Sequence, residues 1–315
     1  MKTTVDYLRF RARHNPWAIL EAIRPAFGSA ADDLSLGEAQ RGVEGWKYRR
    51  ALRLFDDIEI GFIDYDGPHM REWNRLDMAG GGCDWVQDWM VIETLPQRLA
   101  AVELRRLDIA LTTIDGSITH ERVLAAHAAG RFCSGGRGPE MRYVGGSHPR
   151  AGRTVYIGQR KASPKFLRCY EKGWEMLKDV PAGFRDRVTT ITIDRYGVVD
   201  PAKVYRVELE LKAVDRAIRW EVVASERDDA FAGAYPFCAD LLPDAQPVKP
   251  LGIPETRARL QLASAIDNCR RSYGATIKAA LMAYGGDVER VIGMLTADQP
   301  AHHLVAAGVL TVDHV

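Results

Sequence analysis

The chain has 315 residues, of which 46% are hydrophobic, and a formal net charge of +1. This length allows one large or two smaller domains, and the near-zero net charge restricts any nucleic-acid-binding surface to a local patch. The five cysteines are odd in number and contain no CxxC pair, which argues against a disulfide framework or a zinc site.

The N-terminal segment carries charges throughout, and no run approaches the roughly 18 apolar residues of a membrane span. We therefore expect a soluble cytoplasmic protein without a membrane partner.

Alternation of apolar and polar residues predicts four strands in the first hundred residues, at 5–11, 46–53, 58–64 and 72–78. Pro16 opens a predicted helix, residues 28–43 are interpreted as a loop, and the glycine run 80–82 as a strand end. Asp84 is a candidate N-cap for a helix over 85–101.

The clearest strand of the chain is predicted at 104–112, where Asp108 faces away from the apolar positions. Thr119 caps a predicted helix that ends at Gly130. Residues 132–152 are glycine-rich and basic and are interpreted as a loop. Further strands are predicted at 188–194 and 205–212 and further helices at 174–177 and 213–225. The strand at 205–212 alternates strictly, so that its polar side chains share one face: Arg206, Glu208, Glu210 and Lys212.

Residues 153–173 (RTVYIGQRKASPKFLRCYEKG) are predicted to form a β-hairpin. Its strands run over 154–159 and 165–171, and residues 161–164 form the turn. Along the second strand Phe166, Arg168, Tyr170 and Lys172 fall on one face. Tyr170 thus has a cation two residues away on each side. The alternative reading is a cross-strand aromatic residue among solvated charges.

The proline-rich span 236–254 is a candidate linker, followed by helices at about 255–272, 275–284 and 287–296. No internal repeat of fixed period is found. Irregularly mixed strands and helices favour an α+β fold, in which helices cover one face of an antiparallel sheet. We expect a catalytic domain over residues 1–242 and a small C-terminal helical accessory domain over 251–315. The basic residues of that appendage could grip duplex DNA, or its apolar stripe (Leu260, Ile266, Ile277, Leu281 and Ile292) could pack a dimer.

Carboxylates are expected on the polar face of this sheet. If the strands at 104–112 and 205–212 share the sheet, Asp108, Glu208 and Glu210 project from its polar face. Residues i and i+2 of a strand lie about 6.5–7 Å apart, and neighbouring carboxylates repel unless they are solvated, paired or bridged by a cation. Mg²⁺ or Mn²⁺ takes oxygen ligands of this kind. The alternative is an ordinary solvated face with ion pairs.

The hairpin region is also strongly basic. Residues 142–172 carry eight lysines and arginines and one glutamate, a local charge of +7. Three interleaved tyrosines and Phe166 offer surfaces on which bases stack. Cations and aromatic rings in this combination are typical of a single-strand groove. The candidate DNA-binding residues are Arg153, Tyr156, Arg160, Lys161, Lys165, Arg206 and Lys212.

A tyrosine beside a metal and a phosphodiester suggests one reaction, in which the phenolate attacks phosphorus and forms a covalent phosphotyrosine. Tyrosine ionises near pH 10 unaided. Arg168 and Lys172 are expected to favour the phenolate if they lie within about 4–6 Å of it. Tyr156, Tyr196 and Tyr205 are the next candidates for the nucleophile.

Three segments in this order, LDIALTTIDG (107–116), the hairpin block and YRVELELK (205–212), resemble the Rep_trans-type replication initiation factor family. Members of that family initiate rolling-circle replication of plasmids and phages, or nick transfer origins as relaxases. The resemblance covers roughly residues 5–242. It implies an HUH-endonuclease-like sheet in which acidic residues replace the histidine pair. It also implies Tyr170 as nucleophile and Asp108 with Glu208 or Glu210 as metal ligands.

Two features of the sequence bear on that resemblance. No His-hydrophobe-His motif occurs, and His302-His303 lies far away in the tail. Family members often carry a further acid where this chain has Thr112 or Thr113, and Asp115 is a candidate replacement.

These observations together predict a metal-dependent DNA endonuclease and ligase that nicks an origin and leaves a 3′-OH for a polymerase. The predicted partner is origin DNA, as a single strand or a hairpin, with a host helicase and polymerase and a second copy of the chain as further candidates. Three alternatives stay open: a conjugative relaxase of an integrative element with the same chemistry, a DNA-binding regulator without catalysis, and a nuclease that uses water with Glu208 or Glu210 as base.

Overall fold

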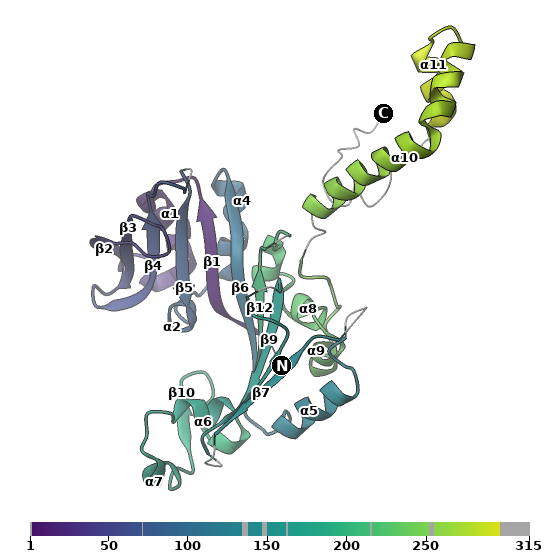
Figure 1. Ribbon diagram of the computed structural model, residues 1–315. Helices are drawn as coiled ribbons and strands as arrows, with labels where there is room; N and C mark the ends of the chain where they lie inside the picture. Colours follow the sequence, from purple (N-terminus) through teal and green to yellow (C-terminus); the bar gives the residue numbers. More distant parts are fainter. Residues whose placement is uncertain are drawn as a thin grey trace. The chain divides into compact units, whose positions relative to one another are not determined.

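The computed structural model describes residues 2–70, 72–133, 138–146, 150–161, 163–214, 216–251 and 255–296. It divides the chain into two compact units. The first consists of residues 1–214 and 218–251, and the second holds the C-terminal helices (Figure 1). His302-His303 and the side chains of Arg257, Arg259 and Leu260 lie outside the described residues. None of the helices in the described ranges has the length and apolar content needed to cross a membrane.

The first unit is built on one ten-stranded antiparallel sheet (Figure 1). Its order is β2-β3-β4-β5-β1-β6-β12-β9-β8-β7, and a separate two-stranded ribbon pairs β10 with β11. The strand bounds are β1 Thr4–Ala12, β2 Leu34–Arg41, β3 Tyr48–Leu54, β4 Ile58–Tyr65, β5 Asn74–Ala79, β6 Val102–Thr113, β7 Met141–Gly145, β8 Arg153–Ile157, β9 Lys165–Tyr170, β10 Ile191–Ile193, β11 Gly197–Val199 and β12 Tyr205–Lys212.

Helices bury one face of this sheet, as predicted for the α+β class. The strands alternate, so Leu8, Leu107 and Leu209 point into a continuous apolar core. Side chains of α1 Pro16–Ile23 and α5 His120–Ala128 complete that core, and Asn15 and Thr119 cap the two helices. The remaining helical segments of this unit are η1 Arg24–Ala30, α2 Gly80–Cys83, α3 Trp89–Glu93, α4 Leu95–Arg98, α6 Lys172–Met176, α7 Ala182–Arg185, η2 Pro201–Lys203, η3 Trp220–Val223, α8 Arg227–Ala232 and α9 Pro236–Leu241.

Two strands lie where the sequence predicted only loops. They are β2, inside 28–43, and β7, inside 132–152, and they form the two edges of the sheet. Their residues are mostly exposed, so neither segment shows the alternation of a half-buried strand. Pairing with β3 and β8 makes these segments strands.

Two of the helices predicted from the sequence differ from those in the structure. The helix predicted over 85–101 is two short helices that meet at Thr94, just before Pro96, because proline cannot donate a helical hydrogen bond. The helix predicted over 213–225 is wrong: Ile218 forms an isolated β-bridge with Leu251, and only η3 is helical there.

The second unit is a helical hairpin of α10 Glu255–Ala283 and α11 Val288–Leu295. The break predicted between 272 and 275 is absent, and α10 continues through Gly274. The turn contains Gly285 and Gly286 with φ of 64° and 85°, values that glycine adopts readily. Asp287 caps α11 by accepting a hydrogen bond from the Arg290 amide.

Candidate active site

Three adjacent strands bring the predicted catalytic residues onto one face. β12 lies between β6 and β9, and its register sets Glu210 opposite Asp108, Glu208 opposite Arg168, and Arg206 opposite Tyr170. The expectation that the strands at 104–112 and 205–212 share a sheet is therefore confirmed. Asp108, Glu208, Glu210 and Tyr170 all point away from the helix-covered face, and each is at most 5% exposed.

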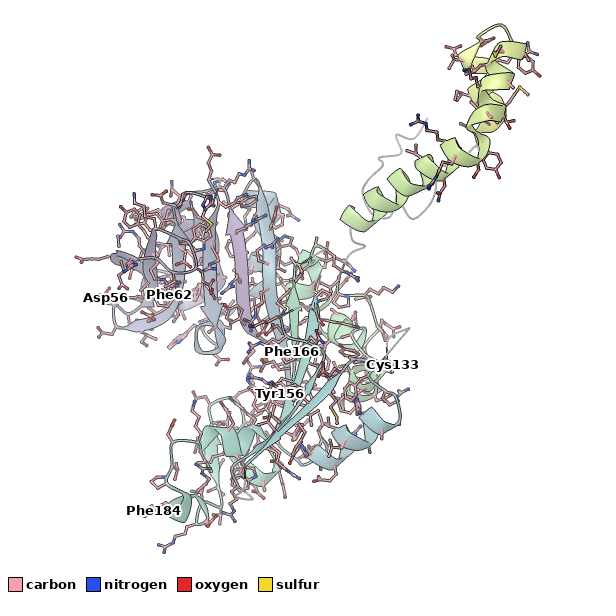
Figure 2. All side chains as sticks on the ribbon, viewed as in Figure 1. Asp56, Phe62, Cys133, Tyr156, Phe166 and Phe184 are labelled. Atoms are coloured by element: carbon pink, nitrogen blue, oxygen red, sulfur yellow. The ribbon has the colours of Figure 1, made fainter. Side chains whose placement is uncertain are left out.

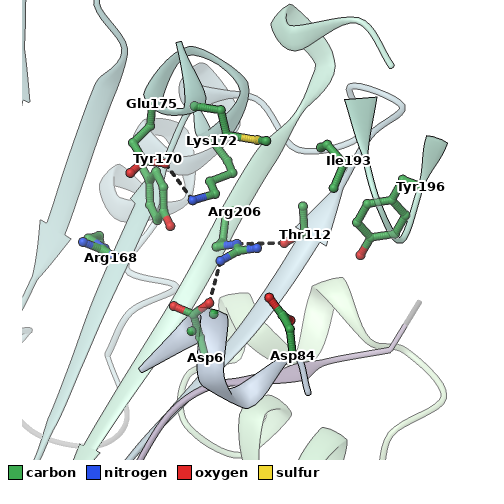
Figure 3. Close-up of a pocket in the computed structure, with 13 residues that line it drawn as sticks. Asp6, Asp84, Thr112, Arg168, Tyr170, Lys172, Glu175, Ile193, Tyr196 and Arg206 are labelled. Atoms are coloured by element: carbon green, nitrogen blue, oxygen red, sulfur yellow. Dashed lines mark hydrogen bonds and ion pairs between the residues drawn. The ribbon is translucent and has the colours of Figure 1, made fainter. Parts of the chain in front are cut away.

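A cavity of about 390 Å³ opens on this face beside Tyr170 (Figure 3). It is lined by the three predicted catalytic residues, Arg168, Tyr170 and Lys172, and by Arg206. Two carboxylates that the sequence analysis did not single out for this site, Asp6 and Asp84, also line it. The other lining residues are Gly80, Gly81, Thr112, Glu175, Met176, Ile193 and Tyr196.

Tyr170 has a carboxylate partner within reach. Its hydroxyl donates to Glu208 Oε2 at 3.3 Å, and the same oxygen accepts from Arg168 at 2.6 Å. The Arg168 guanidinium lies 4.6 Å from the Tyr170 ring centroid, and Lys172 Nζ lies 5.8 Å from it. Burial raises the pKa of Tyr170 above its ordinary value, while the charges of Arg206 and Arg168 act in the opposite direction. The hydroxyl therefore needs a proton acceptor to become a nucleophile.

Arg206 is fixed at the centre of the cavity. It donates to Asp6 Oδ1 at 2.7 Å and to Thr112 Oγ1 at 2.9 Å (Figure 3). Asp6 occupies a register shift of β1 between Val5 and Tyr7, and such a bulge redirects a side chain. A period-two reading of β1 cannot show this bulge, which explains why Asp6 was missed.

Asp84 reaches the cavity through α2. The glycine run follows the end of β5 at Ala79, as predicted, and itself forms this short helix. A Cβ on Gly82 would lie 1.9 Å from the Ile60 carbonyl oxygen, so only glycine fits. Burial raises the pKa of Asp84, and the neighbouring charge of Asp6 acts in the same direction.

The three proposed metal ligands are held by basic side chains. Arg106 donates to Asp108 at 2.8 Å and lies 2.9 Å from Glu210. Glu210 also pairs with Arg160 at 3.0 Å and Lys212 at 3.1 Å. Burial raises the pKa of Asp108 to about 7 despite Arg106.

This donor set does not fit a metal centre as it lies. In the described part of the chain no group of three His, Cys, Asp or Glu side chains is placed to hold a metal ion. Arg106 lies between Asp108 and Glu210. Glu208 instead contacts Tyr170 and Arg168. Asp115, the candidate fourth acid, is exposed and accepts from the Ser117 amide at 2.9 Å, outside the cavity.

The candidate DNA-binding residues divide between two faces. Tyr156, Arg206 and Lys212 lie on the Tyr170 face, where Tyr156 stacks on Phe166 with ring centroids 5.7 Å apart. Arg160, with its side chain 57% exposed, reaches the same face through Glu210, and Lys161 is exposed in the turn.

Arg153 and Lys165 are not brought together with Tyr170. They alternate onto the helix-covered face. There Arg153 pairs with Glu171 and Glu121, and Lys165 donates to the Ala234 carbonyl.

Two tyrosines line the cavity, Tyr170 and Tyr196. Tyr196 reaches it from the turn of the β10–β11 ribbon (Figure 3). Tyr205 lies on the apolar face with its hydroxyl 3.3 Å from His120 Nδ1. Tyr196 is therefore the structurally relevant competitor of Tyr170.

The chain belongs to the replication initiation factor family, whose model (Rep_trans) matches residues 102–292. Among solved structures, the rolling circle replication initiator protein from Geobacillus stearothermophilus matches with a TM-score of 0.51 and 19% sequence identity. The match covers 74% of this chain and 83% of that chain, and at this identity it shows a shared fold. No curated protein matches this chain. The matched family region contains Asp108, Tyr170 and Glu208, whereas β1–β5 lie before it.

Proposed function

We propose that the protein initiates rolling-circle replication by cutting one strand of an origin and joining itself to the DNA through Tyr170. The observation that carries this proposal is the Tyr170 hydroxyl in a cavity, 3.3 Å from a carboxylate that can take its proton. Arg168, Lys172 and Arg206 supply positive charge to the same space, beside the carboxylates of Asp6, Asp84 and Glu175. Such a cavity suits the phosphate of a single strand.

The phenolic oxygen of Tyr170 attacks the phosphorus of the scissile phosphodiester. The bond between phosphorus and the 3′ oxygen breaks, and a 5′-phosphotyrosine forms. The tyrosine proton passes to Glu208, and the departing 3′ oxygen takes a proton from water to become the 3′-OH. Arg168 and Arg206 stabilise the charge that develops on the non-bridging oxygens. Attack of a 3′-OH on the phosphotyrosine reverses the step and joins the strand.

Mg²⁺ or Mn²⁺ stays a prediction as the cofactor, with Asp108, Glu208 and Glu210 as its proposed ligands. When bound, such an ion neutralises phosphate charge. Arg106 would first have to leave the space between Asp108 and Glu210, so no step above depends on the ion.

Adduct formation tests this proposal directly. The protein is incubated with single strands that span the candidate origin, together with Mn²⁺, and covalent complexes are resolved on a denaturing gel. Tyr170→Phe should abolish the adduct, whereas Tyr196→Phe, changed in the same cavity, should retain it. An adduct that persists in Tyr170→Phe and disappears in Tyr196→Phe would overturn the assignment of the nucleophile. Salt-dependent binding without any cleavage would instead favour the DNA-binding regulator.

A second copy of the chain is the proposed partner of the C-terminal unit. Ile266 and Ile292, two residues of its apolar stripe, are 59% and 48% exposed. Large exposed apolar side chains in one small unit are typical of an association surface. Sedimentation of the full chain and of an Ile266→Asp, Ile292→Asp variant tests this, since a dimer should shift to monomer.

A further inference from the structure

The large sheet has the same topology on both sides of its centre. Outward from the central antiparallel β1–β6 pair, the order is β1, β5, β4, β3, β2 on one side and β6, β12, β9, β8, β7 on the other (Figure 1). In each half the first strand leads into a helix, α1 or α5. After the helix, the chain forms the edge strand of the sheet. Each following strand of the sheet then lies one position closer to the centre, until the last one pairs with the first strand. This strand order is the one that a two-fold axis normal to the sheet would produce.

The register extends this correspondence to single residues. With the axis at the middle of the β1–β6 pairing, between Leu8 and Leu107, the cross-strand series Arg9, Asp77, Phe62 corresponds to Asp108, Glu210, Phe166. Both phenylalanines lie on the middle strand of their half, β4 or β9 (Figure 2).

In both halves, an ion pair between the same two strands lies two residues further along. Arg75 pairs with Asp64 at 2.6 Å, and Glu208 pairs with Arg168 at 2.6 Å, with the charges exchanged. The N-terminal half therefore repeats the strand order and register of the half that carries Tyr170, although the sequence shows no repeat of fixed period.

The N-terminal half has a cavity at the corresponding place. Asp66 follows Asp64 by two residues, as Tyr170 follows Arg168. A cavity of about 450 Å³ lies here, where β1 and β4 end and β5 begins. The strands that correspond to these, β6, β9 and β12, carry Thr112, Tyr170 and Arg206 of the first cavity. The residues that decide its chemistry are Arg13, His14, Tyr65, Asp66, Glu72 and Trp73.

We propose that this N-terminal cavity binds an unpaired nucleotide of the DNA strand, with its base against Trp73 and its phosphate at Arg13. The proposal rests on DNA as the ligand of the proposed function, but not on cleavage by Tyr170. It assigns a role to β1–β5, which precede the region matched by the family model.

Trp73 and its arginines supply the stacking surface. The Arg11 guanidinium lies 4.3 Å and the Arg13 guanidinium 5.0 Å from the Trp73 ring centroid. Flat aromatic and guanidinium surfaces are those on which unpaired bases stack. Arg11 is paired with Glu103 at 2.7 Å. Arg13 is exposed and forms no ion pair with another described residue, so its charge is available to a phosphate.

The two carboxylates of the cavity favour a base over a second phosphate. Asp66 and Glu72 are exposed acceptors, and carboxylates accept hydrogen bonds from the amino groups of bases while they repel phosphates. Lys47, 3.5 Å from Asp66, offsets part of this negative charge. This arrangement suits a base with an exocyclic amino group. The base would enter the cavity while its phosphate stays at Arg13.

The experiment compares binding of a fluorescein-labelled single-stranded oligonucleotide and of the same sequence as a duplex, by anisotropy with the full chain. Trp73→Ala should weaken single-strand binding about tenfold, the usual effect of losing one stacked base, and Trp73→Phe should restore most of it. Duplex binding should stay unchanged, because a paired base cannot enter the cavity. Phe184→Ala, which removes a 65% exposed aromatic ring outside both cavities, is the matched control.

A second readout locates the contact. Single strands that carry 5-bromodeoxyuridine are cross-linked by light, and the modified peptide should contain Trp73. The proposal is overturned if Trp73→Ala binds the single strand as tightly as Phe184→Ala. It is also overturned if both DNA forms lose affinity equally, or if no cross-link reaches the Trp73 peptide. Repeating the measurements in Tyr170→Phe separates this outcome from failure of the cleavage proposal, which the adduct assay reports.

Discussion

Replacing Glu208 by glutamine keeps the shape of the side chain but removes the charge that faces Tyr170. Glu208 Oε2 lies 3.3 Å from the Tyr170 hydroxyl. With an ordinary pKa near 10, roughly 0.1–1% of a tyrosine is phenolate near neutral pH, and burial raises the pKa of Tyr170 further. A positioned proton acceptor contributes about 10²–10⁴-fold to such a step. We therefore expect adduct formation by Glu208→Gln to slow by about 10²–10⁴-fold near neutral pH.

The pH dependence separates this role from a structural one. Because the phenolate forms on its own as the pH rises toward that of tyrosine ionisation, the defect of Glu208→Gln should shrink at high pH. Single-turnover rates at saturating DNA, from about pH 6 to 10, measure this. Glu175→Gln is the control, since Glu175 lines the same cavity but pairs with Lys172 at 2.6 Å. A defect that is equal at every pH, or as large in Glu175→Gln, would refute proton transfer to Glu208.

Three further predictions concern the charged residues around the cavity. Burial raises the pKa of Asp108 from 3.8 to about 7, so the folded state binds this proton more tightly than the unfolded chain does. The resulting stability is present below about pH 4 and lost as the pH rises through about 7. In Asp108→Asn, the free energy of unfolding measured with urea should fall less between these pH values, by roughly 1–4 kcal/mol. An unchanged pH profile would contradict this. Arg160→Ala should reduce the slope of log affinity against log salt concentration for single-strand binding by roughly 0.7. Lys165→Ala, which lies on the other face of the sheet, should leave this slope unchanged. Equal slopes in the two variants would show that the face on which the cation lies does not matter. Glu210→Gln should raise the Mn²⁺ concentration for half-maximal adduct formation about tenfold or more if Glu210 is a ligand, and an unchanged Mn²⁺ dependence with lower thermal stability would make it only a partner of its arginines.

The central strands and their polar face could be predicted from the sequence. In β6, β9 and β12 the apolar residues of the core face alternate with the functional ones. Parity therefore puts Asp108, Tyr170 and Glu208 on one side once the three strands share a sheet. The same parity rule, applied to Arg153 and Lys165, already separates them from Tyr170. The charge count grouped them with the other cations because it ignores the face on which each lies.

The rest of the cavity could not be predicted, because local patterns do not record it. Asp6 depends on a bulge in β1, and Asp84 depends on α2 packing its glycines against Ile60. The edge strands β2 and β7 bury little, so their pairing partners and not their own residues make them strands. Arg106 and Asp108 lie two residues apart on β6, but the ion pair of Arg106 with Glu210 joins β6 to β12. A reading of single strands does not show that second pair, and it left a metal ion as one natural partner of the carboxylates.

The sequence by itself determined the fold class, the tyrosine face and the basic hairpin, because burial of one face imposes a period of two on every strand it includes. Only the tertiary structure decided which charges meet. It paired the expected metal ligands with arginines and brought Asp6 and Asp84 to Tyr170. It also gave the N-terminal half the same strand arrangement as the catalytic half. That symmetry lies in strand order and register, which depend on hydrogen bonds between distant segments and leave no repeat along the chain.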